Sequence, residues 1–165
     1  MKKLMVAVLF LTSVLFADVV KDGYFVGINS GSIKYTEDSK NENMKSIKIG
    51  MHFYDENRFL ISNRLYLNVD KSKRGDENVV IGNINLEWIW NKIPFVKPFI
   101  GFGTGYMYKT KDSVGFFSVG TGILIYLGEN IELEGGLRVY NPSKQGSDDW
   151  PDKIKKAYAG INISF

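Results

Sequence analysis

The side chains that could carry ionic chemistry in this sequence recur at positions that alternate with apolar residues. Four cations and three carboxylates share this phase. They are Lys48, Arg64, Arg138, Lys156, Glu87, Glu132 and Glu134. Charges that are taken out of water persist only when they are paired and hydrogen-bonded. We therefore interpret the seven residues as an ion-pair network and ask which elements would bring them together.

The single histidine, His52, does not belong to a catalytic motif. It lies in the stretch M-H-F-Y-D-E-N (residues 51–57), and no serine follows it at the spacing of a His-x-Ser pair. A hydrolase of that type needs a nucleophile within reach of the imidazole base. We expect the ring to be hydrogen-bonded to a neighbouring side chain, and we predict no catalytic residues in this chain.

No metal or cofactor motif stands out. The acidic stretch S-D-D-W-P-D (Ser147–Asp152) has carboxylates for Ca²⁺, but it lacks the glycine-centred spacing of a dedicated calcium loop. The chain has no cysteine, so it must hold its fold without disulfides. We expect no metal site and no cofactor, and we expect the acidic stretch to be solvated.

The elements that position these side chains begin after a separate N-terminal segment. Two lysines precede Leu4–Phe16, a nearly uncharged apolar run of 13 residues that ends next to Ala17. A membrane-spanning helix needs about 20 apolar residues, whereas this layout is typical of a secretory signal peptide. We expect residues 1–17 to be a cleavable signal peptide and residues 18–165 to form one exported domain.

Charge and hydropathy exclude two classes of protein. The chain has 21 basic and 18 acidic residues, a net charge of +3, and loss of the two lysines in the signal leaves +1. The mature chain is therefore not a strongly basic nucleic-acid binder. No apolar run of about 18 residues follows the signal, so we expect no transmembrane helix.

The remaining sequence predicts a series of β-strands. From Gly23 onward apolar and polar residues alternate with period 2, and no helical period competes. We predict eight strands: Tyr24–Tyr35, Lys45–Tyr54, Arg58–Val69, Val79–Trp90, Lys97–Tyr108, Val114–Leu127, Ile131–Tyr140 and Ile154–Phe165. The polar face of these strands carries the charged residues and many glycines. Glycine weakens a strand, so its frequency indicates a crowded interior or a sharply bent wall.

The breaks between the predicted strands alternate in length. Long or medium polar breaks take turns with tight ones: Thr36–Met44, Asp70–Asn78, Lys109–Ser113 and Asn141–Lys153 against Asp55–Asn57, Asn91–Val96 and Gly128–Asn130. An even number of strands, with long connections at one end and short turns at the other, is the plan of a transmembrane β-barrel.

Two closed sheets fit this pattern, a soluble lipocalin-like barrel with an apolar interior and a membrane barrel with a polar one. Mixed charges with glycine favour a narrow lumen, and the lipocalin-type Gly-x-Trp signal is absent from the first strand, which begins G-Y-F-V-G. Aromatic residues gather near the strand ends, as in the girdles of a membrane barrel. They are Tyr24, Phe53, Phe59, Trp88, Trp90, Tyr126 and Phe165 at one end, and Tyr35, Tyr66, Tyr106, Tyr108 and Tyr140 at the other. We predict an all-β fold, an eight-stranded antiparallel up-and-down transmembrane β-barrel.

Such a barrel would bring the candidate residues together. Eight strands leave an interior about wide enough for side chains to fill, so we expect a plugged lumen. Arg64 and Glu87 fall on neighbouring strands, and Glu134 can project across the lumen. A structural plug is the favoured interpretation, and a small gated conductance is the alternative. Because lipid offers no partner to backbone groups, the last strand must pair with Tyr24–Tyr35.

Two stretches carry a resemblance, P-F-I-G-F-G-T-G-Y (Pro98–Tyr106) and I-E-L-E-G-G-L-R-V-Y (Ile131–Tyr140). Together with the signal peptide, the strand number and the terminal aromatic, they resemble the small eight-stranded bacterial outer-membrane barrels, a family that includes the transmembrane domain of outer-membrane protein A and outer-membrane protein X. The resemblance covers about residues 18–165 and implies a place in the outer membrane of a Gram-negative cell. No peptidoglycan-binding domain follows the barrel, so that role is not expected.

The resemblance also implies a role for the final stretch, Y-A-G-I-N-I-S-F. In this family a last strand with a terminal Phe is the signal read by the barrel-assembly machinery, which is therefore an expected partner during biogenesis. The matching residues are Ala159, Ile161, Ile163 and Phe165. The sequence departs from the family at Ile163, where tyrosine is common.

Function is expected at the long connections, because loops on a rigid scaffold carry binding in many folds. The longest, Asn141–Lys153, is expected to expose Trp150. We predict a monomeric structural and surface-interaction protein whose partners are outer-membrane lipid, lipopolysaccharide and an unidentified surface ligand, and not nucleic acid. The alternative is a minor porin-like channel or a lipid-modifying barrel.

Overall fold

The computed structural model describes residues 23–35, 40–53, 61–93, 95–110, 112–143 and 150–165, so the predicted signal peptide lies outside the described residues. The described chain forms eight β-strands in the predicted order. They are β1 (Gly23–Lys34), β2 (Glu42–Phe53), β3 (Ile61–Arg74), β4 (Glu77–Trp90), β5 (Val96–Lys109), β6 (Asp112–Tyr126), β7 (Ile131–Pro142) and β8 (Ile154–Ser164). In this part of the chain no helix has the length and apolar character needed to cross a membrane.

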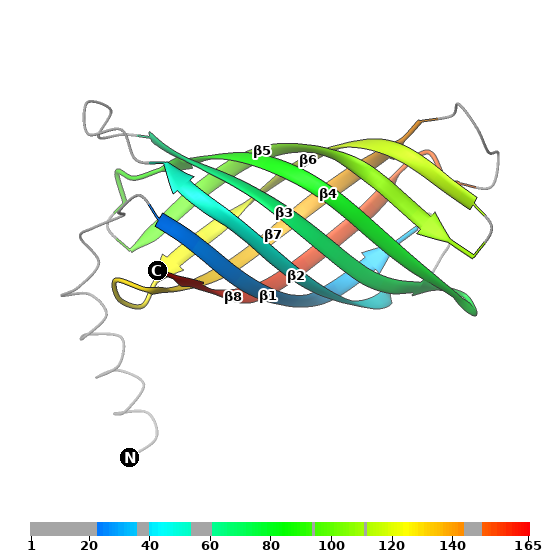
Figure 1. Cartoon of the computed structure of the whole chain (residues 1–165), viewed down its shortest axis with the longest axis horizontal. Coiled ribbons are helices and arrows are strands. Elements are labelled where there is room, and N and C mark those ends of the chain that lie inside the picture. Colours follow the sequence, from blue (N-terminus) through cyan, green and yellow to red (C-terminus); the bar gives the residue numbers. More distant parts are fainter. Residues whose placement is uncertain (1–22, 36–39, 54–60, 94, 111, 144–149) are drawn as a thin grey trace, which may run out of the picture.

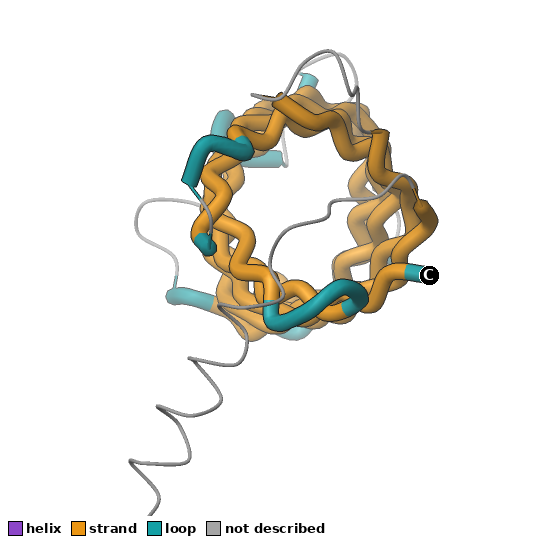
Figure 2. Tube along the Cα trace, turned by 90° about the vertical axis from the view of Figure 1, so that its left-hand side faces the viewer, coloured by secondary structure: helices purple, strands orange, loops and turns teal. Residues whose placement is uncertain are grey.

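The strands close into one barrel, seen from the side in Figure 1 and along its axis in Figure 2. Each strand is antiparallel to the next, and β8 completes the ring by pairing with β1, from Phe25 opposite Ser164 to Lys34 opposite Lys155. The backbones of Tyr24 and Phe165 also exchange hydrogen bonds of 3.2 and 2.9 Å. The predicted all-β, eight-stranded antiparallel up-and-down barrel is confirmed, and the chain is hydrogen-bonded to its last residue.

The strands are staggered around the ring. A row of paired residues leaves β1 at Gly23, crosses each of the strands from β2 to β8 in turn and returns to β1 at Ile33, ten residues further on. Between these two positions the row passes through His52, Arg64, Glu87, Gly101, Gly120, Arg138 and Lys156. With a rise of about 3.3 Å per residue and about 4.8 Å between strands, this stagger tilts the strands by about 40° and sets a barrel radius of about 8 Å. A barrel of this radius is filled by its own side chains.

We call the end of the barrel that carries the β1–β2, β3–β4, β5–β6 and β7–β8 connections the loop side, and the opposite end the turn side. On the loop side the predicted long break Asp70–Asn78 is wrong, because β3 and β4 run through it and leave a two-residue turn. Gly75 in this turn has φ of +62°, which suits the first position of a tight hairpin turn. Asp70 and Ser72 continue the inward phase of β3 and are buried. Their polar side chains made this part of the strand look like a loop in the sequence.

The other connections are partly as predicted. The β5–β6 connection is also shorter than expected, with residues 110–111 between the two strands. On the turn side the predicted break Gly128–Asn130 falls between strands, and so does Asn91–Val96 except for Val96, which begins β5. Asp55–Asn57 and parts of Thr36–Met44 and Asn141–Lys153 lie outside the described residues.

The two faces of the wall are inverted relative to a protein with an apolar core. Large apolar side chains point outward and are exposed, with Ile47 at 68% and Ile28 at 64%, whereas most inward positions are buried and many are charged. The outward aromatic residues include Tyr24, Phe53, Trp90, Tyr106, Tyr108 and Phe165. Four tyrosines assigned to the girdles are instead buried inside the barrel, because they occupy the inward phase of the wall: Tyr35, Tyr66, Tyr126 and Tyr140. Phe59 lies outside the described residues.

Candidate functional site

The lumen is filled by charged residues and two apolar clusters. The larger cluster, which we call the loop-side layer, consists of Ile33, Tyr35, Met44, Val79, Ile81, Met107, Val114, Phe116, Tyr140, Trp150, Ile154 and Tyr158. A smaller cluster lines β4–β6 toward the turn side, with Ile89, Phe99, Leu124 and Tyr126. The alternation in the sequence predicts a polar interior, so neither apolar cluster was expected. A signal was present, since apolar residues occupy both phases where Val79, Val80 and Ile81 follow one another.

Arg64 lies at the centre of the charged residues. Its guanidinium donates to Glu87 Oε2 through Nε at 3.0 Å and Nη2 at 2.5 Å. Nη2 also lies 2.9 Å from Glu134 Oε2, and Nη1 lies 3.6 Å from Glu132 Oε2. Arg64 and Glu87 face each other on β3 and β4, as predicted, while Glu134 reaches Arg64 from β7. One fully buried guanidinium thus connects three carboxylates.

Glu134 and Glu132 on β7 have further partners. From β2, Lys48 forms an ion pair through Nζ with Glu134 Oε2. Asn162 Nδ2 donates to Glu134 Oε2 at 3.0 Å and to Glu132 Oε2 at 3.1 Å. His52 lies inward near the turn side, with Nε2 2.9 Å from Glu132 Oε1. The histidine therefore contacts the carboxylate of a neighbouring side chain, inside the lumen.

Arg138 reaches Glu87 across two strands that carry no side chains at the crossing point. Its Nη2 lies 2.8 Å from Glu87 Oε1 although β5 and β6 separate the two residues. In the row of paired residues the intervening positions are Gly101 and Gly120. A Cβ built on Gly120 would lie 3.0 Å from Arg138 Nε, so the glycines leave the room that this ion pair occupies.

The fourth cation, Lys156, pairs with Asp70, which was not among the residues predicted for the network. Its Nζ lies 2.7 Å from Asp70 Oδ1, and Asp70 also accepts hydrogen bonds from Tyr140 at 3.0 Å and from Asn68 at 2.9 Å. Asp70 escaped notice because it falls in a stretch interpreted as a loop. The spacing would have revealed it, since Arg64, Asn68 and Asp70 share one phase of β3.

With Asp70 included, the network is balanced in formal charge. Four cations face four carboxylates, and all eight are buried: Lys48, Arg64, Arg138 and Lys156 against Asp70, Glu87, Glu132 and Glu134. Pairing of this kind is what permits charge to be buried. A further buried cation, Lys97, lies outside this set, with Nζ 4.4 Å from the ring centroid of Tyr126.

Trp150 does not occupy the exposed position that was predicted for it. Only 8% of the residue is accessible, and it belongs to the loop-side layer. Arg74 and Lys109, at the loop-side ends of β3 and β5, lie 5.7 and 5.4 Å from the indole ring. The indole is therefore covered by residues of two neighbouring hairpins. Tyr35 lies in the same layer just beyond β1, where burial raises the pKa of its hydroxyl to about 12.

The four residues assigned to the assembly signal lie on the outer face of the closing strand. Ala159, Ile161, Ile163 and Phe165 alternate with inward positions of β8, and Phe165 is 72% exposed at the turn side. Their positions suit contact with lipid. Their role in assembly stays a prediction.

Among the described residues no group of three or more His, Asp or Glu side chains is arranged to hold a metal ion. Most of the acidic stretch Ser147–Asp152 lies outside those residues.

Comparison with known proteins finds similarity in structure and not in sequence. No family model and no curated protein matches the sequence. Among solved structures, the barrel is similar to neisserial surface protein A, with 15% identity and a TM-score of 0.62 over 87% of this chain and 97% of that one. It is also similar to the outer membrane enzyme PagL, with 12% identity and a TM-score of 0.56 over 86% and 99% of the two chains. Ail, the attachment invasion locus protein of Yersinia pestis, matches with 12% identity and a TM-score of 0.53 over 87% and 97%. The chain therefore has the closed eight-stranded β-barrel fold of small bacterial outer-membrane proteins.

Proposed function

We propose that this chain is an integral outer-membrane protein that acts at the cell surface through its loop side, with a lumen plugged by its own side chains. The observation that carries the proposal is the inversion of the wall. Charged residues are paired inside, while isoleucine, leucine and valine side chains cover the outside. In water such a continuous apolar belt would drive aggregation. In lipid it is satisfied, and the closed ring leaves no backbone edge unpaired.

Membrane fractionation combined with electrophoresis of unheated and boiled samples tests this proposal. The protein should sediment with the outer membrane, and the unheated barrel should migrate differently from the boiled chain. Recovery in the soluble periplasmic fraction would overturn both the proposed insertion of the barrel in the outer membrane and the proposed function.

A surface role is supported by the way the loop side is built. Two tight hairpins, β3–β4 and β5–β6, hold Trp150 between them and make a firm platform for the remaining connections. Among the structural neighbours, Ail has been crystallised in complex with the heparin analogue sucrose octasulfate, which supports an anionic surface ligand for this fold. Because Trp150 is buried, its replacement by alanine would test the packing of the platform. Any effect of this change on ligand binding would be indirect, through that packing.

The channel alternative predicts a conductance that the filled lumen argues against. The loop-side layer and the ion pairs around Arg64 occupy the interior of a barrel that is already narrow. Single-channel recording in planar bilayers should show no steady conductance for the wild-type protein. If a conductance exists and changes in Glu87→Ala or Arg64→Ala, the lumen is a gated pore and the plug proposal fails.

The lipid-modifying alternative rests on the likeness to PagL, an outer membrane enzyme of the same fold. In this chain the one histidine contacts Glu132 and packs 4.9 Å from the Phe25 ring, inside the barrel near the turn side. Its ring is separated from the loop side by the loop-side layer. Mass spectrometry of lipid A from cells with and without the protein should show no difference, and a change in mass would favour the enzyme.

A further inference from the structure

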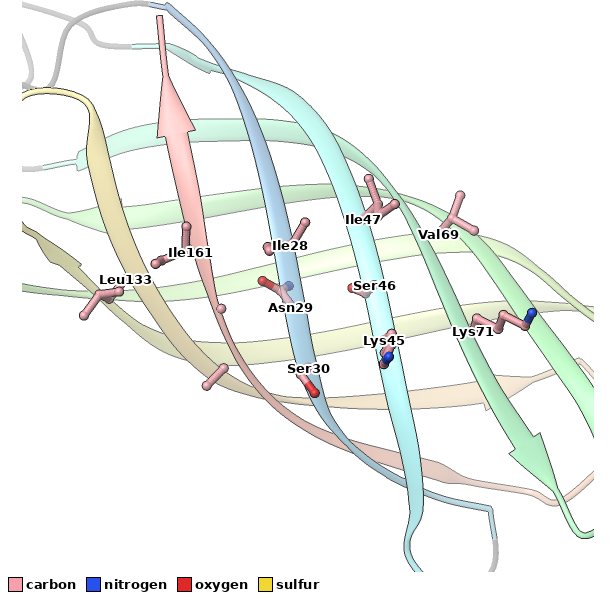
Figure 3. A pocket seen from close by; sticks show the side chains of 12 residues that line it. Ile28, Asn29, Ser30, Lys45, Ser46, Ile47, Val69, Lys71, Leu133 and Ile161 are labelled. Carbon is pink, nitrogen blue, oxygen red and sulfur yellow. The ribbon is translucent and has the colours of Figure 1, made fainter.

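The outer surface of β7, β8, β1, β2 and β3 carries a hollow of about 830 Å³, shown in Figure 3. A hollow on this face is unusual, because the outward side chains of the barrel are mostly large. Its origin lies in the register of the strands. Gly135, Ala159 and Ser30 are successive partners in one row of paired residues, and all three belong to the outward phase. Three neighbouring strands therefore present small side chains at the same point.

The same row continues into two lysines. Ser30 pairs with Lys45 on β2, and Lys45 pairs with Lys71 on β3. Both lysines are exposed on the outer face, in the loop-side halves of their strands. Like charges directly opposite each other in a sheet are destabilising. Neither lysine forms an ion pair with another described residue, so no carboxylate among those residues offsets the repulsion between the two ammonium groups.

The next outward row toward the turn side has the opposite character. It consists of Leu133, Ile161, Ile28, Ile47 and Val69, which are again successive partners. All five line the hollow. The hollow is therefore bounded by branched aliphatic side chains toward the turn side and by ammonium groups at its β2–β3 end.

A second, polar pocket of about 340 Å³ adjoins the first on the loop side. The two pockets share Lys45 and Lys71, and the second adds Lys73. One carboxylate, Glu42, also lines the polar pocket, against three lysines. The net charge there is positive, and the exposed side chains of Asn43 and Asn78 add hydrogen-bonding groups.

We propose that this surface binds one lipid of net negative charge, with the charge on its phosphate, from the leaflet on the loop side. The phosphate lies between Lys45, Lys71 and Lys73, and an acyl chain fills the hollow over Ser30 and Ala159. An amphipathic ligand fits this arrangement, because the apolar hollow and the cationic pocket meet at the two shared lysines. A phosphate there relieves the repulsion between Lys45 and Lys71, and near an anionic lipid surface each lysine contributes to the attraction. The proposal rests on the proposed insertion of the barrel in a membrane.

The test uses the full mature chain in nanodiscs of phosphatidylcholine mixed with phosphatidylglycerol, followed by native mass spectrometry of the released barrel. The wild-type protein should retain one phosphatidylglycerol in preference to phosphatidylcholine. In the Lys45→Gln/Lys71→Gln variant the ratio of retained phosphatidylglycerol to phosphatidylcholine should fall about 30-fold. Ser30→Leu fills the hollow without changing charge and should also abolish retention.

Matched controls separate the site from general effects of charge and bulk. Lys92→Gln removes an exposed lysine near the turn side, and Thr104→Leu adds bulk to an exposed outward position on β5. Both should retain the lipid as the wild type does.

Three outcomes would overturn the proposal: equal retention of the two lipids by the wild type, unchanged retention in the double lysine variant, or a dimer in place of the lipid-bound monomer. Electrophoresis of unheated and boiled portions of the same samples distinguishes two kinds of failure. A heat-modifiable barrel without bound lipid removes this site alone, whereas a chain that never forms the barrel removes the proposed function as well.

Discussion

At the scale of single residues, Arg64 shows how charge is tolerated inside this barrel. Its side chain is fully buried, and its guanidinium lies among the carboxylates of Glu87, Glu132 and Glu134. It also packs against aromatic rings, with Cζ 5.3 Å from the centroid of Phe25. A planar group with five donors in a fixed fork suits this position, because two of its nitrogens bind Glu87 while its Nη2 and Nη1 also face the other two carboxylates.

Replacement of Arg64 by methionine should therefore be costly. The change leaves Glu87 and Glu134 buried with fewer cations, and removal of one partner of a buried ion pair typically costs about 3–5 kcal/mol. The free energy of unfolding can be measured by urea titration in lipid vesicles, with the fluorescence of Trp88 and Trp90 as the probe. The exposed Lys92→Gln change serves as the control. A loss below about 1 kcal/mol for Arg64→Met would mean that the network contributes little to stability.

At the scale of elements, β5 and β6 lack inward side chains at the point where Arg138 crosses the lumen to Glu87. Gly101 and Gly120 lie side by side on the inner face, and Arg138 extends over them to Glu87. Glycine inside a strand weakens it. Here the space it leaves admits a long side chain from one neighbouring strand to a carboxylate on the other.

Gly120→Val should disrupt this crossing, while the same change at Gly82 should not. A Cβ at Gly120 would lie 3.0–3.1 Å from the guanidinium of Arg138, whereas a Cβ at Gly82 meets nothing within 4 Å. We expect Gly120→Val to lower the free energy of unfolding by about 1–3 kcal/mol through overpacking, and Gly82→Val to change it by less than about 0.5 kcal/mol. Equal effects of the two variants would show that strand glycines act through backbone propensity alone.

The sequence predicted the elements well and their ends poorly. Period-2 alternation identified all eight strands, and it placed Arg64, Glu87 and Glu134 on the face where they meet. At Asp70–Asn78 the polar composition predicted a loop, although the alternation of the strands continues through this stretch. Composition describes what a residue can bind, while its phase in the strand decides where the side chain points.

Tertiary context explains what else the sequence did not reveal. Trp150 follows residues 144–149, which lie outside the described residues, and its burial comes from the loop-side layer and from the two hairpins beside it. Tyr66 was assigned to a girdle by its residue type, yet its hydroxyl donates to Glu87 at 2.6 Å inside the barrel. Contacts between residues on strands far apart in the chain are set by the stagger of the barrel, which a single sequence does not specify.

At the scale of the whole molecule, the barrel depends on closure between its first and last strands. Tyr24 and Phe165 exchange two backbone hydrogen bonds at the turn-side end of this seam. Deletion of Phe165 removes both bonds together with the terminal aromatic side chain. Phe53 provides a matched comparison, since it is also an outward aromatic residue near the turn side.

We expect the deletion of Phe165 to harm assembly more than Phe53→Ala does. The two lost hydrogen bonds are worth about 1 kcal/mol each, and the proposed assembly signal is lost with them. The measurement is the fraction of newly made protein that becomes heat-modifiable in the outer membrane. If both variants assemble equally well, the terminal residue has no role beyond that of any girdle aromatic.

The seam between β1 and β8 has a consequence for the order of events during biogenesis. The strand that leaves the ribosome first finds one of its two neighbours only when the last residues have been made. No shorter intermediate can satisfy both edges of β1, and contacts between distant parts of a chain are slow to form. In the outer-membrane setting proposed above, the unfolded polypeptide would reach the membrane with its apolar outer face uncovered. We therefore expect its assembly to depend on the supply of holding chaperones, whereas the folded barrel should not.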